Sequence, residues 1–103
     1  MIAVHGLEST KQEAVHIGGL DKRLRVAINQ SLGDAGFEAK VVKVGAHAAV
    51  SPNNICNQGR SGAGVQLELT RALRDVLVNS PEKMNAFAKS IQSSIANTLG
   101  LRP

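Results

Sequence analysis

The sequence has no tryptophan, no tyrosine and only two phenylalanines among its 103 residues. Proteins that bind single-stranded nucleic acid commonly stack the bases on exposed aromatic side chains, and RNA-recognition sheets do the same. So few aromatic residues argue against both of these classes. They also predict a core that is built from aliphatic side chains.

Cysteine is almost absent as well, because Cys56 is the single one. An intrachain disulfide and a multi-cysteine zinc site are therefore excluded, and a reducing compartment is indicated. Long apolar runs are also missing: no stretch approaches the roughly 18 residues of a membrane span, and the first residues do not resemble a signal peptide. We expect a cytoplasmic protein that is not inserted in a membrane.

Acidic residues are fewer than basic ones, with 8 Asp and Glu against 12 Lys and Arg and a net charge of +4. This balance permits a polyanionic partner, either nucleic acid or an acidic polymer. The densest basic group comprises Lys22, Arg23 and Arg25, and a solvated helix face explains it equally well. The charge therefore allows such a partner without requiring one.

The length suits one domain, which we expect to cover residues 1–103. Apolar and β-branched runs predict strands at residues 2–5, 14–17, 37–44 and 65–70. The first is expected to be buried and to end at His5, where Gly6 turns the chain. The order of strands and helices predicts an α/β fold, a small mixed sheet with packed helices.

Two helices are indicated by periodicity and end signals, and a shorter one is expected at residues 70–77. The first has Asp21 as its N-cap and an apolar residue at every fourth position. The last begins with Ser80 as N-cap and Pro81 at its first position, and stops at Gly100. Its apolar stripe, which we expect to pack against the sheet, comprises Met84, Phe87, Ile91, Ile95 and Leu99.

Glu68 is the most informative candidate for chemistry. It lies in the middle of a short strand whose apolar residues alternate with polar ones, directly behind a long loop at residues 45–64 that is rich in glycine and amides. A carboxylate held there is either desolvated, or paired with a cation or metal, and acid–base catalysis uses both situations. The alternative is a glutamate on an edge strand that faces water or pairs with Arg71 or Arg74.

Several segments together resemble the second half of the poly-gamma-glutamate hydrolase family. They are Val-His-Gly at residues 4–6, Val-His-Ile-Gly-Gly-Leu-Asp at 15–21, Leu-Gly-Asp-Ala-Gly-Phe at 32–37, Asn-Ile-Cys-Asn at 54–57 and Gly-Val-Gln-Leu-Glu-Leu-Thr-Arg-Ala-Leu-Arg at 64–74. Members are phage-associated zinc peptidases with a metallocarboxypeptidase-like three-layer fold, and some have the label phage-related replication protein. The resemblance covers about residues 2–77.

This resemblance implies zinc-dependent hydrolysis of γ-glutamyl amide bonds, with His5 as one of three protein ligands to zinc. Glu68 matches the glutamate that activates the metal-bound water. Arg60 and the amides of Asn54 and Asn57 are our candidates for binding the carboxylate of the substrate or the developing oxyanion. The family's other two ligands, a histidine and a glutamate, lie in an N-terminal half that these 103 residues do not include, so the zinc site is incomplete.

Three alternatives stay open at this level. His5 and Glu8, with His16 or His47, would complete a zinc site within the chain. A homo-oligomer or a separate N-terminal partner would supply the missing ligands from outside. Finally, a non-enzymatic module would use the same site to bind a polyanion, either polyglutamate or nucleic acid, without turnover.

Overall fold

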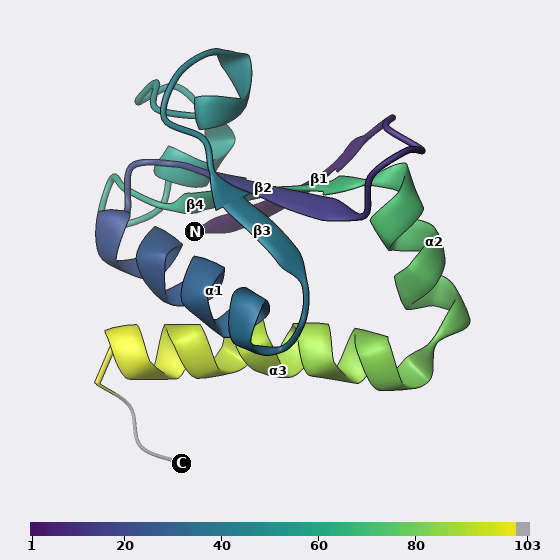
Figure 1. Ribbon diagram of the computed structural model, residues 1–103. Helices are drawn as coiled ribbons and strands as arrows, with labels where there is room; N and C mark the ends of the chain where they lie inside the picture. Colours follow the sequence, from purple (N-terminus) through teal and green to yellow (C-terminus); the bar gives the residue numbers. More distant parts are fainter. Residues whose placement is uncertain (101–103) are drawn as a thin grey trace.

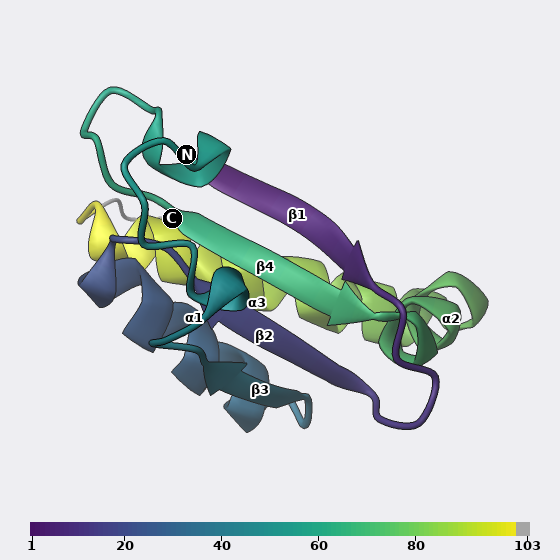
Figure 2. The same cartoon turned by 90° about the horizontal axis from the view of Figure 1, so that it is seen from above.

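The structure is a computed structural model that describes residues 1–100. Its centre is a four-stranded mixed sheet in the order β1-β4-β2-β3, with strands β1 (Ile2–Leu7), β2 (Ala14–Gly18), β3 (Glu38–Val41) and β4 (Val65–Thr70). Figure 2 shows the four strands side by side. β4 runs parallel to β1 and antiparallel to β2, while β2 and β3 are parallel. The predicted fold class, an α/β fold with a small mixed sheet and packed helices, is confirmed.

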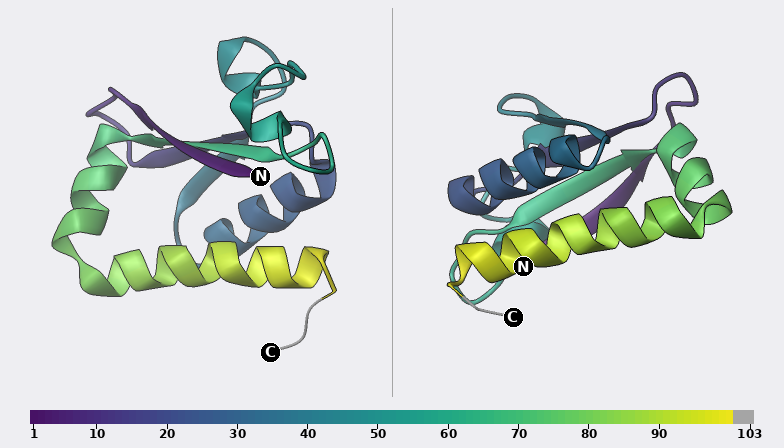
Figure 3. Two further views of the ribbon diagram at one scale, coloured as in Figure 1. Left: turned by 180° about the vertical axis from the view of Figure 1, so that it is seen from behind. Right: turned by 60° about the horizontal axis from the view of Figure 1, so that its bottom comes forward.

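The helices are α1 (Lys22–Asp34), α2 (Arg71–Asn79) and α3 (Pro81–Thr98), and they all lie on one side of this sheet. As Figures 1 and 3 show, α1 and α3 run beneath one face, and α2 leads from the end of the sheet to α3. The core between sheet and helices is aliphatic apart from Phe87 and the partly buried Phe37, whose rings meet edge to face. The aliphatic core expected from the scarcity of aromatic residues is thus present.

β4 is the centre of the core because it is buried along its whole length. Val65, Leu67 and Leu69 are each at most 6% exposed and belong to the cluster that packs under the helices. Since neighbouring side chains of a strand point to opposite faces, Gln66 and Glu68 face away from the helices. The predicted alternation of this strand is therefore present in the fold.

The helix ends follow the predicted capping residues. Asp21 accepts a hydrogen bond from the Leu24 N–H, and Ser80 accepts one from the Lys83 N–H. Pro81 occupies the first turn of α3, and Gly100, with φ +73°, follows its end. Such side-chain acceptors satisfy backbone N–H groups that a helix start leaves without partners.

Three predictions about the elements need correction. The stripe of α3 is buried only in its middle: Phe87 belongs to the core cluster that contains β4, and Ile91 and Ile95 pack against that cluster. The ends of the stripe, Met84 and Leu99, are exposed. β1 extends to Leu7 and is an edge strand, so His5 is exposed in mid-strand instead of being buried at its end. β3 ends at Val41, before the expected limit at residue 44.

The segment from residue 42 to residue 64 rises over the other face of the sheet and contains two short 3₁₀ helices, η1 (Ala46–Ala48) and η2 (Ile55–Asn57). η1 contacts β2, while η2 contacts β1 and β4. The polar face of the sheet is therefore partly covered by loop and not by helix. In the part of the chain that the structure describes, no helix is long and apolar enough to cross a membrane.

Candidate functional site

The centre of the candidate site is a row of polar side chains across the sheet. The pairing of β4 places Glu68 in register with His5 of β1 on one side and with His16 of β2 on the other. Residues in register on neighbouring strands are about 5 Å apart and face the same side. His5, Glu68 and His16 thus share the face opposite the helices, although 63 positions separate His5 from Glu68 in the sequence.

Glu68 is buried, with 9% of its surface exposed, and both of its carboxylate oxygens have partners. Oε2 lies 2.6 Å from His47 Nδ1, and Oε1 accepts a hydrogen bond of 2.7 Å from Gln66 Nε2. Gln66 is itself held by Asn54, whose Nδ2 donates to Gln66 Oε1 at 3.3 Å. The alternative of an edge-strand glutamate paired with Arg71 or Arg74 is wrong, because β4 is an inner strand and the carboxylate meets a histidine.

His47 reaches Glu68 because η1 packs closely against the end of β2. The Gly19 N–H donates to the Ala48 carbonyl at 2.8 Å. A Cβ atom at Gly18 would lie 2.6 Å from the Ala48 carbonyl oxygen, so only glycine permits this approach. Ala49, in the left-handed region at φ 52°, reverses the chain directly afterwards. Gly18 therefore determines how closely η1, and with it His47, approaches β2.

His16 lies on the far side of Glu68 from His5 and is partly buried. Burial lowers the pKa of His16 below its ordinary value of 6.5, and the positive charges of Lys40 and His47 act in the same direction. The nearby Glu68 carboxylate acts in the opposite direction, with a smaller effect. His16 Nε2 is buried and has no hydrogen-bond partner among residues 1–100. We conclude that this imidazole is neutral at pH 7.

Asn57 connects several parts of the loop through hydrogen bonds of its side chain. Its Oδ1 accepts from the Leu20 and Gly64 N–H groups, and its Nδ2 donates to the Ala49 and Ser51 carbonyls. The side chain is buried, and its four hydrogen bonds are all to backbone groups of the loop and of residues beside it. A role of Asn57 in substrate binding stays a prediction, and this geometry favours a structural one.

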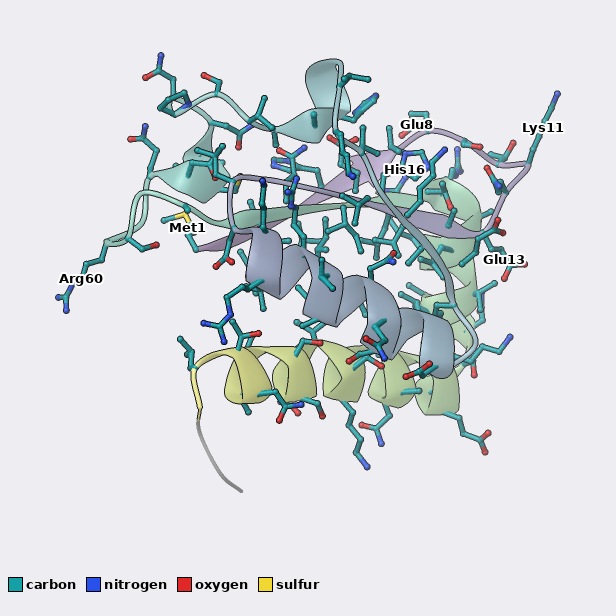
Figure 4. All side chains as sticks on the ribbon, turned by 60° about the vertical axis from the view of Figure 1, so that its left-hand side comes forward. Met1, Glu8, Lys11, Glu13, His16 and Arg60 are labelled. Carbon is teal, nitrogen blue, oxygen red and sulfur yellow. The ribbon has the colours of Figure 1, made fainter. Side chains whose placement is uncertain are left out.

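The other two predicted substrate-binding residues lie differently. Asn54 caps η2 through its Oδ1, which accepts from the Cys56 N–H, and its Nδ2 supports Gln66. Arg60 is exposed, and Figure 4 shows it pointing away from the molecule at the end opposite His16. The structure therefore brings His5, Glu68 and Asn54 to one face of the sheet and leaves Arg60 apart.

A complete zinc site within the chain is not present, because residues 1–100 contain no group of three His, Cys, Asp or Glu side chains that could hold a metal ion. His5 and His16 lie on opposite sides of β4, about 10 Å apart by strand spacing, whereas a zinc ion holds each nitrogen at about 2 Å. Glu8 is directed to Arg74, at 3.7 Å. The proposed His5, Glu8 and His16 or His47 set is thus wrong, and these residues alone do not fit a catalytic zinc.

Two partners of Glu68 were not predicted as such: Gln66 was assigned no role, and His47 was considered only as a zinc ligand. Gln66 lies two positions before Glu68 in the same strand and so shares its face, a signal that the alternation contained. His47 belongs to a loop, and no local pattern indicates that it contacts Glu68. The contact between His47 and Glu68 can be inferred only when the close approach of η1 to Gly18 is known.

The architecture places the chain with one half of a known hydrolase fold. It superposes on the structure of a bacteriophage poly-gamma-glutamate hydrolase with a TM-score of 0.86 and 29% identity, covering 98% of this chain and 54% of that one. A second structure, the zinc-free form of YndL, gives a TM-score of 0.83 at 27% identity and is covered to 53%.

The chain belongs to the poly-gamma-glutamate hydrolase family, whose model matches residues 1–96. Curated relatives from Bacillus subtilis (strain 168) include the UPF0714 protein YndL, 33% identical over 78 residues, which are 75% of this chain and 31% of YndL. The SPbeta prophage-derived UPF0714 protein YoqZ is 31% identical over 77% of this chain and 29% of its own length. The chain thus spans about a third of these relatives and about half of the solved structures.

Proposed function

We propose that this chain supplies the proton-accepting carboxylate, Glu68, to a hydrolase of γ-glutamyl amide bonds. The observation that carries the proposal is the register of β1 and β4, which sets Glu68 beside His5 on the face that the helices leave uncovered. Membership of the poly-gamma-glutamate hydrolase family supports the choice of substrate. Glu68 is buried beside a histidine and an amide, and this supports a catalytic role over that of a surface carboxylate that only increases solubility.

In this proposal Glu68 accepts a proton from the water that attacks the amide carbonyl, and later returns it to the leaving amine. Gln66 holds one carboxylate oxygen, so the other is directed to the reacting water once it separates from His47. His5 is the residue of this chain that would hold zinc, and further ligands would come from outside these 103 residues. Bound zinc supplies a water of lowered pKa and polarises the carbonyl.

A second candidate is a module that binds a polyanion without hydrolysing it. It is favoured by one observation, the lack of a three-ligand metal site among residues 1–100. The two candidates differ in a simple way. If the chain is part of a hydrolase, cleavage of the polymer requires Glu68 once the missing zinc ligands are supplied. If it is a binding module, the polymer is bound but not cleaved.

The test is a chimera in which residues 1–96 replace the matching segment of the bacteriophage poly-gamma-glutamate hydrolase. We expect the chimera to shorten poly-γ-glutamate, measured by gel filtration, and Glu68→Gln to lower the rate by about 10²–10⁴-fold. The zinc content of the Glu68→Gln chimera, measured by mass spectrometry, should equal that of the unsubstituted chimera. The matched control is Glu38→Gln, which makes the same change at an exposed position of β3.

A chimera in which Glu68→Gln keeps full activity would refute the assignment of the base. If the unsubstituted chimera is folded and contains zinc but does not cleave the polymer, the binding module is the better explanation. His5→Ala gives a separate readout, because we expect it to reduce the zinc content itself.

A further inference from the structure

A second feature, away from Glu68, is a surface pocket of about 540 Å³ beside the edge strand β3. Its lining residues come from the first turns of α1, the end of β3 and the segment that follows β3. Its lining is cationic and apolar and includes no acidic residue: Lys22, Arg25, Val26, Val41, Lys43 and Val50. Val41 is in register with the core residue Ile17, so the pocket opens on the helix side of the sheet.

Arg25 is the unusual residue of this pocket, because it is only 8% exposed. Its Nε atom is buried and has no hydrogen-bond partner, and within residues 1–100 the guanidinium forms no ion pair. Arginine is almost never buried without a partner, since an unpaired buried charge is costly. The pocket therefore holds a largely buried guanidinium with no anionic partner among residues 1–100.

The surrounding charges strengthen this conclusion. Lys22 lies one helical turn before Arg25, and Lys43, in the segment after β3, also lines the pocket. With no carboxylate in the lining, these cations repel one another and attract an anion. The sequence analysis treated the basic group around Arg25 as one that a solvated helix face would explain, but the burial of Arg25 does not agree with that interpretation.

We infer that this pocket binds a free carboxylate of a γ-linked polyglutamate chain, an inference that rests on the proposed function. The planar guanidinium matches a carboxylate with two parallel hydrogen bonds. Each γ-linked residue has a free α-carboxylate followed by two methylene groups, and the valines at positions 26, 41 and 50 provide apolar contacts for those methylenes. Nucleic acid is a poorer match, since both phenylalanines pack together in the core and cannot stack bases.

The pocket and the candidate active site are joined by a single segment. Residues 42–50 place Lys43 and Val50 at the pocket and His47 on Glu68. Only β2 separates β4 from β3 in the sheet. A polymer that occupies both the pocket and the Glu68 site therefore passes around the short edge strand β3. The pocket then binds a glutamate residue of the polymer at a distance from the bond that is cleaved.

The test is calorimetric binding of a short γ-linked glutamate oligomer to the 103-residue chain at low ionic strength. We expect Arg25→Met, which keeps the aliphatic stem, to weaken binding by about tenfold or more. Lys43→Gln, at an exposed position outside the helices and strands, should weaken it in the same direction without a risk to the fold. Arg23→Gln is the matched control, because it removes the same charge from an exposed position of the same helix, and its effect should stay within about twofold.

Three further probes separate the possible outcomes. An oligomer with amidated carboxylates should not bind, while inorganic phosphate and a single-stranded oligonucleotide should bind more weakly than the glutamate oligomer. Equal losses for Arg25→Met and Arg23→Gln, or tighter Arg25-dependent binding of phosphate or the oligonucleotide, would overturn the inference. Because the binding measurement requires no hydrolysis, the activity of the Glu68→Gln chimera and the affinity of the Arg25→Met chain are measured separately, and a failure of the catalytic proposal is distinguishable from a failure of this one.

Discussion

Replacing Thr70 by valine should destabilise the protein strongly, because one buried hydroxyl accepts two backbone hydrogen bonds. Thr70 is 1% exposed, and its Oγ1 accepts from the Ala14 N–H at 3.1 Å and from the Leu73 N–H at 3.2 Å. The second bond caps α2 and is worth about 1 kcal/mol. Loss of the first leaves a buried N–H without a partner, which costs about 1–3 kcal/mol. We therefore expect Thr70→Val to lower the free energy of unfolding by about 2–4 kcal/mol.

Thr70→Ser is the matched control, since it keeps the hydroxyl and loses one buried methyl group, at a cost of about 1 kcal/mol. Urea denaturation followed by circular dichroism at 222 nm measures both variants, because the chain has no tryptophan or tyrosine to report by fluorescence. The slopes of the transitions should agree with the unsubstituted protein. If valine is no more destabilising than serine, the two hydrogen bonds do not have the importance given to them here.

Two further predictions concern stability as well. Gly18→Ala should lower the free energy of unfolding by about 1–3 kcal/mol, because the added methyl group forces η1 away from β2. Gly33→Ala should raise it by about 0.5–1 kcal/mol, because nothing lies within 4 Å of the added methyl group and alanine favours the helix. Similar values for the two variants would contradict the steric argument. Because burial lowers the pKa of His16, the unfolded chain binds its proton more readily, so the stability present above pH 6.5 should decline as the pH falls from that value to the lower folded pKa. Denaturation from pH 7.5 to 5.5 should show a smaller decline for His16→Gln.

The pattern of β4 could be predicted from the sequence because its signal is local. Val65, Leu67 and Leu69 alternate with polar residues, and a strand has only two faces. Burying the apolar half beneath the helices leaves Glu68 on the other face, as the structure has it. The caps of α1 and α3 were predictable for the same reason, since a capping side chain bonds to a backbone N–H only three positions away in each case.

The remainder depends on contacts between distant segments. The apolar run at the start of β1 suggested a buried strand, but burial of a strand depends on its neighbours, and Val4 is 64% exposed because β1 is at the edge of the sheet. The contact of His47 with Glu68 depends on how a loop of about twenty residues folds back over β2. The burial of Arg25 depends on how α1 lies beside β3, which no helical periodicity specifies.

The pairing of His5, Glu68 and His16 also has a consequence for how this protein could vary. A shift of β4 by one position would reverse its two faces together, exposing three apolar side chains and turning the carboxylate toward the helices. A protein with this shifted register would not remain folded. We therefore expect Glu68 to face away from the helices in every folded molecule. Drift in the aliphatic residues beneath the sheet can therefore alter stability without moving the acid, and the acid can be exchanged without repacking the interior.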